Sequence, residues 1–148
     1  MRCFTQSLCV LIGLVGGPIA HAACVFEIEA GDGLTYSTSS MEADVSCGTV
    51  AVTIRHTGQM PKIAMGHNWV LTRPDDYLSV APAGMASGPE GDYVPAGDAR
   101  VIANTRLVGG GETDTVEFSL EGLAPGEYVY FCSFPGHWTV MKGTFTIL

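Results

Sequence analysis

The sequence has few basic residues. Its 148 residues include 7 lysines and arginines against 15 aspartates and glutamates, which gives a formal net charge of −8 at pH 7. The basic residues are scattered along the chain and form no cluster. Because an acidic surface repels the phosphate backbone, this composition argues against nucleic acid as a partner.

Phosphate-binding loops, repeats and linkers are absent as well. The three glycines at residues 109–111 are not followed by the Lys-Ser or Lys-Thr pair and the helix that a phosphate-binding loop requires. We interpret them as a hairpin turn. No internal repeat, low-complexity segment or linker divides the chain, so we expect one globular domain.

Long apolar runs are missing except near the start. Residues 8–15 are apolar and interrupted only by Gly13, Arg2 precedes them, and residues 20–22 read Ala-His-Ala, which fits the small-x-small cleavage rule. We predict that residues 1–22 form a secretory signal peptide, because the run is too short to span a membrane. Residues 23–148 then form the mature domain, with no membrane insertion.

Cysteine is scarce. Two of the five cysteines belong to the predicted signal, and the mature chain keeps Cys24, Cys47 and Cys132. In an oxidising compartment two of these three should pair. Cys24 and Cys47 flank the first predicted pair of strands, and we expect them to form the disulfide, which leaves Cys132. Alternatively, Cys24 is a lipoprotein acceptor, although His21 stands where such signals have leucine.

Most of the chain alternates between apolar and polar residues with a period of two. Residues 26–29, 50–55 and 116–120 show the pattern clearly and read as half-buried strands. Seven or eight such strands, with a turn roughly every ten residues, predict an all-β, Greek-key β-sandwich. Residues 74–87 are the exception. Proline at the start, two aspartates in the first turn and Pro82 further along predict a short helix or flap.

One stretch near the end has the character of a metal-binding loop. It contains a thiol, an imidazole and a thioether spaced as Cys132-x4-His137-x3-Met141, with a Pro-Gly turn between the first two. A lone cysteine on an aromatic strand is usually a small buried hydrophobic residue, but this spacing directs three side chains to a common point. Two histidine nitrogens, one cysteine sulfur and a weak axial methionine are the ligands of blue-copper electron-transfer sites.

A second imidazole is needed for such a site. The mature chain offers only His56, His67 and His137. A histidine before a strand is more often a structural hydrogen-bonding residue than a ligand. A two-histidine site must nevertheless use two of these three, and His67, between Gly66 and Asn68, is a better choice than His56. We interpret His56 as a surface or edge residue at a strand end.

Two other uses of these residues are weaker. A cysteine nucleophile with His137 as its base needs an orienting third group and an oxyanion hole, and usually takes the two residues from separate segments. A structural zinc site would use the same nitrogen and sulfur atoms, but methionine is a poor zinc ligand.

Three segments of the sequence closely resemble the azurins, which are bacterial blue-copper electron carriers of the cupredoxin family. They are residues 65–71, residues 84–88, and residues 131–137 with 141–144. The resemblance covers residues 23–148 and places Cys24 and Cys47 where azurins have their disulfide. The five-residue step from Cys132 to His137 separates the chain from the plastocyanin-like and amicyanin-like proteins, whose loops are shorter.

The resemblance implies a ligand set and its surroundings. His67, Cys132 and His137 would be the strong ligands of one type 1 copper, with Met141 as a long axial thioether and the Gly66 carbonyl as the opposite axial contact. Asn68 would tie the two ligand loops together. The amides of Asn68 and Phe134 would donate to the Cys132 sulfur and so tune the reduction potential. Residues 74–87 match the helical flap of the azurins.

The resemblance also implies a function. The protein would be a periplasmic electron carrier, not an enzyme, that cycles copper between Cu(I) and Cu(II). Its partners would be transient redox proteins, such as c-type cytochromes, reductases or oxidases, that dock on a small apolar patch. The expected patch residues are Met60, Met65, Met85, Phe134, Pro135 and Trp138, although about half of the methionine and phenylalanine side chains are expected to be core packing. Trp138, Leu34 and Asn104 depart from residues common in azurins, and Trp138 puts the potential and the choice of partner in question.

Two copper-based alternatives remain to be weighed. A nitrite reductase or multicopper oxidase domain needs a second copper centre with further imidazoles, and only His56 is left for it. A copper storage or delivery protein is harder to exclude. That class favours methionine-rich clusters or Cys-x-x-Cys, and neither occurs in the mature chain.

Overall fold

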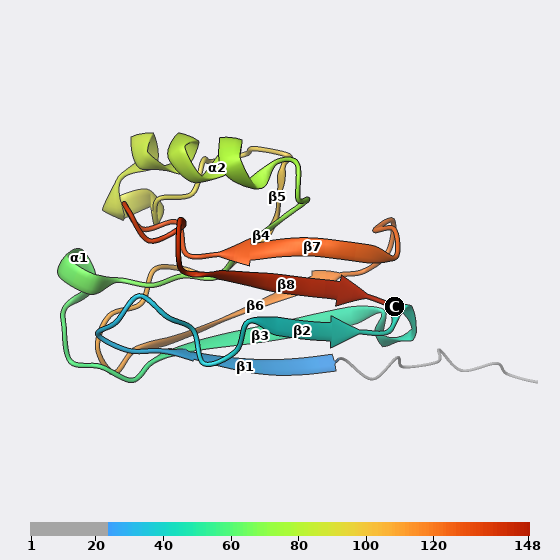
Figure 1. The fold of residues 1–148 in the computed structure, drawn as a ribbon, viewed down its shortest axis with the longest axis horizontal. Coiled ribbons are helices and arrows are strands. Elements are labelled where there is room, and N and C mark those ends of the chain that lie inside the picture. Colours follow the sequence, from blue (N-terminus) through green and yellow to red (C-terminus); the bar gives the residue numbers. More distant parts are fainter. Residues whose placement is uncertain (1–23) are drawn as a thin grey trace, which may run out of the picture.

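The computed structural model describes residues 24–148, so the predicted signal peptide lies outside the described residues. Two β-sheets pack face to face (Figure 1). The first has the strand order β1-β3-β6 and the second the order β2-β8-β7-β4-β5. Eight strands in two sheets, with short helices beside them, confirm the predicted β-sandwich.

The first sheet follows from the alternation seen in the sequence. Its strands are β1 (Cys24–Ala30), β3 (Thr49–His56) and β6 (Thr113–Ser119). β1 runs parallel to β3, and β3 runs antiparallel to β6. One face of β3 places Val50, Val52 and Ile54 in the core, each fully buried, while Arg55 and the β1 glutamates face the solvent.

The second sheet carries the ends of the metal-binding loop. Its strands are β2 (Ser40–Ala43), β4 (Val70–Thr72), β5 (Val101–Asn104), β7 (Gly126–Phe131) and β8 (Lys142–Ile147). β7 and β8 form an antiparallel pair whose last register partners are Phe131 and Lys142. The residues between these partners therefore form one long hairpin connection.

Aromatic rings fill much of the space between the sheets. Trp69 is fully buried and stacks on Tyr130, with ring centroids 5.8 Å apart. Phe118 and Phe145 also contact the Trp69 ring. Burying such large side chains contributes strongly to stability, so the core provides a rigid base for the loops at both ends.

Short helices interrupt the sandwich. They are the α-helices α1 (Lys62–Met65) and α2 (Tyr77–Ala83) and the 3-10 helices η1 (Val45–Cys47), η2 (Gly84–Ser87) and η3 (Pro89–Gly91). The predicted flap at residues 74–87 is thus helical, and Pro82 lies one residue before the end of α2. Figure 1 shows α2 against the outer side of the second sheet. It closes a second core cluster there, made of Val70, Tyr77, Val80, Ala81, Val94 and Phe131.

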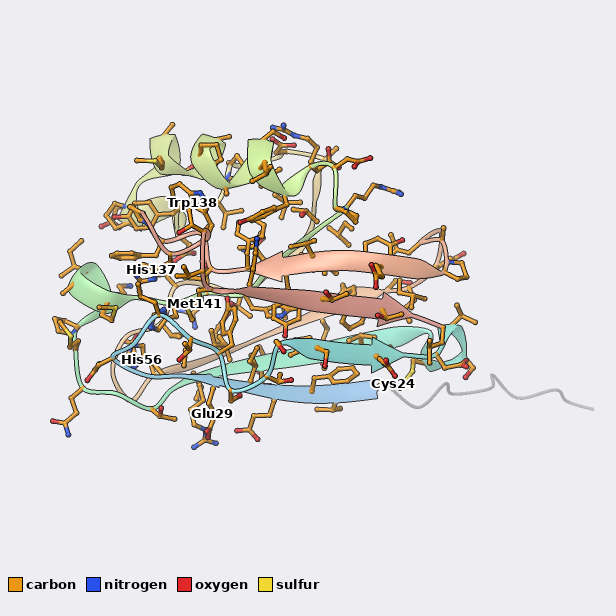
Figure 2. All side chains as sticks on the ribbon, viewed as in Figure 1. Cys24, Glu29, His56, His137, Trp138 and Met141 are labelled. Carbon is orange, nitrogen blue, oxygen red and sulfur yellow. A yellow bond between two sulfur atoms is a disulfide. The ribbon has the colours of Figure 1, made fainter. Side chains whose placement is uncertain are left out.

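The two ends of the sandwich differ. Cys24 and Cys47 form the predicted disulfide, with Cα atoms 5.5 Å apart, and Cys132 is the free cysteine among the described residues. Cys24 lies at one end of the molecule, whereas His137 and Met141 lie at the other (Figure 2). Within residues 24–148, every helix is too short or too polar to cross a membrane.

Candidate metal centre

The hairpin between β7 and β8 brings Cys132, His137 and Met141 together. Cys132 directly follows β7 and Met141 directly precedes β8. The Cys132 amide donates to the Met141 carbonyl at 3.0 Å, and the Met141 amide donates to the His137 carbonyl at 2.8 Å. Gly136 has φ of 83°, a left-handed conformation that favours glycine, and it turns the chain just before His137. These bonds fold the three side chains inwards.

His67 reaches the same point from another segment, between α1 and β4. Its backbone forms an antiparallel bridge with Val108, with N–H to carbonyl distances of 3.0 and 2.8 Å. Gly66 allows a close approach, since a Cβ there would lie 2.3 Å from the Lys62 carbonyl oxygen and 2.8 Å from Leu107. Only a residue without a side chain fits at this position.

His67, Cys132 and His137 form one buried cluster. One ligand atom from each lies within 4.8 Å of the others. The Cys132 Sγ is 3.8 Å from the His67 Nδ1 and 3.5 Å from the His137 Nδ1. The His67 Nε2–H donates to the Gly31 carbonyl at 2.7 Å, which leaves Nδ1 facing the sulfur. His137 is 5% exposed and the other two are fully buried, so only His137 reaches the surface.

Two further predicted groups lie beside the cluster. Met141 is buried and packs with Cys132 and Ala30 in a small apolar group. The Gly66 carbonyl oxygen is 3.9 Å from the Cys132 Sγ. A thioether and a carbonyl therefore accompany the three strong donors, which is the donor chemistry of a site for a soft, redox-active metal such as copper.

Burial suppresses charge on these side chains. It raises the pKa of Cys132 to about 12, although the backbone amides of Asn68 and Phe134 donate to the sulfur and act in the opposite direction. Burial lowers the pKa of His67 to about 4 and also lowers that of His137. Without a cation the site thus holds a neutral thiol and two neutral imidazoles. A metal ion that displaces the thiol proton fits this set, because the imidazoles are already in their ligating form.

Asn68 joins the two ligand segments. Its side-chain oxygen accepts from the Ser133 amide at 2.8 Å, and its side-chain amide donates to the Ser133 hydroxyl at 2.8 Å. The same amide donates to the Asp92 carbonyl at 2.8 Å. The buried hydroxyl of Tyr36 donates to the Asn68 carbonyl. Because Asn68 follows His67 and Ser133 follows Cys132, these bonds fix the distance between the two ligand-bearing segments.

The interpretation of His56 as a surface or edge residue is wrong. His56 is 1% exposed, ends the central strand β3, and stacks on the His67 ring with centroids 5.0 Å apart. Its Nε2–H donates to the Met65 carbonyl at 2.9 Å, and the Gly58 amide donates to its Nδ1 at 3.1 Å. The sequence did contain the signal, since His56 continues the inward-facing series of Val50, Val52 and Ile54.

The predicted docking residues have different degrees of exposure. Met60 is 38% and Met85 50% exposed, whereas Met65, Phe134 and Pro135 are half-buried. Trp138 is also half-buried, packs against the cluster under α2, and accepts a hydrogen bond from Tyr77 at its carbonyl. Sequence reasoning missed two more exposed apolar residues, Ile63 in α1 and Val140 in the hairpin between β7 and β8, which we call the ligand hairpin. Both occur in segments at the end of the sandwich that holds His137, where Figure 1 shows α1.

Other residues around the cluster were also missed by sequence reasoning. Gly31, Tyr36 and Asp92 all contact the His67 segment from loops far away in the sequence. Ser133 was not singled out either, although it stands next to Cys132. No local spacing links these residues to the metal-binding motif, so their roles depend on the fold.

Comparison with known proteins identifies the family. Residues 22–148 match the model of copper-binding proteins of the plastocyanin/azurin family. The chain is 49% identical over 139 residues to azurin from Achromobacter denitrificans and 44% identical over 138 residues to azurin from Pseudomonas aeruginosa, with 93% of each chain covered in both comparisons. Among solved structures, an azurin (Az-iso2) from Methylomonas sp. strain J matches with a TM-score of 0.81 and 43% identity, over 84% of this chain and 98% of that one. The chain therefore belongs to the plastocyanin/azurin family of copper-binding proteins, and its relatives within that family are azurins.

Proposed function

We propose that this protein is a periplasmic blue-copper electron carrier, formed by a single domain over residues 23–148 after removal of a signal peptide at residues 1–22. The observation that carries the proposal is the buried cluster of His67, Cys132 and His137 at one end of a rigid sandwich. The family supports copper as the metal.

Each residue of the cluster has a distinct role in this proposal. The Nδ1 atoms of His67 and His137 and the Cys132 sulfur would hold the copper, and the Met141 thioether and the Gly66 carbonyl would be weaker donors beside them. Copper bound here supplies one-electron chemistry, between Cu(I) and Cu(II). The Gly31 carbonyl fixes the ring orientation and tautomer of His67 through the 2.7 Å bond to Nε2.

The fold keeps the ligands in place in both redox states. The hairpin bonds, the His67–Val108 bridge and the Asn68 network fix the ligand segments to one another and to the sheets. The amides of Asn68 and Phe134 donate to the sulfur and stabilise its negative charge. Because a packed interior resists movement, gain or loss of an electron is expected to require little rearrangement.

Electrons are proposed to pass through the edge of His137. His137 is the residue of the cluster that keeps some exposure, 5%, and its ring lies against Phe134 with ring centroids 4.5 Å apart. The surrounding apolar patch would receive c-type cytochromes, reductases or oxidases in brief encounters. The patch consists of Met60, Met65, Met85, Phe134, Pro135 and the exposed part of Trp138.

A carrier is also favoured over a copper enzyme. A second copper centre would need additional imidazoles, and His56 is the one histidine of the described chain outside the cluster. Both of its ring nitrogens are hydrogen-bonded to the backbone of residues 58 and 65. It is therefore held as a structural residue beneath His67.

The test is the visible spectrum of the mature chain with Cu(II), recorded beside that of Cys132→Ser. An intense blue band that is absent from the variant and bleaches with a mild reductant is the expected result, because the colour of such sites arises from the copper–thiolate bond. Reoxidation of the reduced protein by an oxidised c-type cytochrome would further support an electron-carrier function. A colourless protein that still binds copper would refute the proposal and point to storage or delivery.

A further inference from the structure

The segment after η3 has a strained backbone. Asp92 and Tyr93 have φ of 55° and 54°, in the left-handed region that residues with side chains rarely adopt. Two such residues in succession persist only where their surroundings force them, and such strain is concentrated at functional sites. This segment is the end of the helical insertion, remote in sequence from the metal-binding motif.

Several contacts hold the strained pair in place. Gly84 lies so close that a Cβ on it would be 1.9 Å from the Tyr93 carbonyl oxygen. The Tyr93 amide donates to the Gly88 carbonyl at 2.9 Å, and the Tyr93 ring meets the Phe134 ring edge-on, with centroids 5.3 Å apart. The insertion is therefore packed directly against the ligand hairpin.

Asp92 bonds to three segments at once. Its carbonyl accepts from the Asn68 side-chain amide at 2.8 Å and from the Ser133 hydroxyl at 3.3 Å. Its carboxylate accepts from the Leu107 amide at 2.9 Å. Asn68 and Ser133 belong to the two ligand segments, and Leu107 is the close neighbour of Gly66.

The left-handed conformation determines where the Asp92 carbonyl points. With the carboxylate anchored on Leu107, it directs the carbonyl at Asn68 and Ser133, which are already bonded to each other in both directions. Asp92 thereby completes the hydrogen bonds of the Asn68 side-chain amide. Asn68 in turn supplies one of the two backbone amides that donate to the Cys132 sulfur.

We propose that Asp92 is a positioning residue of the metal centre, whose left-handed backbone and anchored carboxylate fix Asn68 and Ser133 and so maintain amide donation to the Cys132 sulfur. The helical insertion then does more than cover the sheet, because it tunes the electron density on the thiolate. The part that concerns copper rests on the proposed function. Weaker amide donation leaves more negative charge on the sulfur, which favours the oxidised metal and lowers the reduction potential.

Three substitutions separate the left-handed backbone of Asp92 from the hydrogen bond that its carboxylate accepts from Leu107. Asp92→Asn keeps an acceptor oxygen and tolerates the left-handed backbone, whereas Asp92→Gly keeps the backbone conformation but loses the acceptor. Asp92→Val loses both, because a β-branched residue is strained at this φ. Glu90→Ala is the matched control, since Glu90 is an exposed acidic residue two positions earlier. All four variants are made in the full mature chain.

The first readout is amide hydrogen exchange of the metal-free protein, which does not depend on copper. For Asp92→Gly and Asp92→Val we expect the Ser133 amide to exchange about tenfold faster, as the loss of a buried hydrogen bond predicts. The Asp92→Asn and Glu90→Ala variants should have the exchange rate of the wild type. If Asp92→Val does not fold, the exchange rate of Asp92→Gly alone tests the proposal. An unchanged Ser133 exchange rate in a folded Gly variant would overturn the proposal.

The second readout is the reduction potential and the position of the blue band in the copper form. We expect a lower potential and a shifted band in the Gly variant, with no shift in the Asn variant or the control. Faster exchange with an unchanged potential and band would show that Asp92 is merely structural. A colourless wild type would refute the proposed function instead, and the exchange data on the metal-free protein would still decide whether Asp92 holds Asn68 and Ser133.

Discussion

Acid should destabilise the metal-free protein well above the pH at which carboxylates titrate. His67 has its pKa lowered from 6.5 to about 4 by burial, so the unfolded chain binds a proton in this range that the folded protein does not. Acidification therefore favours unfolding between these two values. One such histidine costs about 2 kcal/mol of stability between about pH 7 and pH 5, a large part of the 5–15 kcal/mol typical of a domain. His137 adds to the effect in the same direction.

Urea denaturation of the metal-free protein at a series of pH values measures this effect. With a typical urea dependence, the midpoint should fall by about 1 M between about pH 7 and pH 5. His67→Gln should reduce the fall, because it removes the proton site. Asp98 does not interfere, since its pKa is lowered to about 2 by Arg100 and its contribution is lost only at lower pH. A midpoint that stays constant or rises on acidification would refute the conclusion that His67 is held neutral.

Three further predictions follow from single contacts. Tyr36→Phe should lower the unfolding free energy of the metal-free protein by about 1–3 kcal/mol in urea denaturation, because the buried Asn68 carbonyl loses its tyrosine donor. Replacing Cys24 and Cys47 by serine should cost about 3–4 kcal/mol in the same assay, since the disulfide closes a span of 23 residues, yet leave the blue band unchanged at the opposite end of the molecule. Gly66→Ala should lose the blue band or fail to fold, because the new Cβ would lie 2.3 Å from a backbone oxygen of α1.

Each of these has a contrary outcome, and Tyr36→Phe also has a matched control. The control is Tyr128→Phe, which removes a hydroxyl that donates to the Ala124 carbonyl and so tests the loss of a tyrosine hydrogen bond away from the cluster in the same urea assay. A stability loss for Tyr36→Phe well below the stated range would argue against its bond to Asn68. A shifted blue band in the disulfide variant would show that the two ends of the sandwich are coupled. Normal colour in Gly66→Ala would mean that the Gly66 segment can move.

The sequence predicted the parts of the protein that depend on local spacing. The alternation along β3 and β6 placed strands correctly, and the Cys132-x4-His137-x3-Met141 spacing was informative because a hairpin brings these neighbours together. The role proposed for Asp92 could not be found in this way, since it depends on a left-handed backbone and on contacts with distant segments. His56 was misread although its register was visible, because a polar residue at a strand end is more often exposed.

The hairpin that carries Cys132, His137 and Met141 has one further consequence. Its ends are held at a fixed separation by the pairing of Phe131 with Lys142, whatever the length or composition of the connection between them. Shortening or lengthening that connection would therefore change the arrangement of Cys132, His137 and Met141 without disturbing the two sheets beneath it. A single insertion or deletion in this hairpin would thus alter the proposed metal site while the strands of both sheets keep their order.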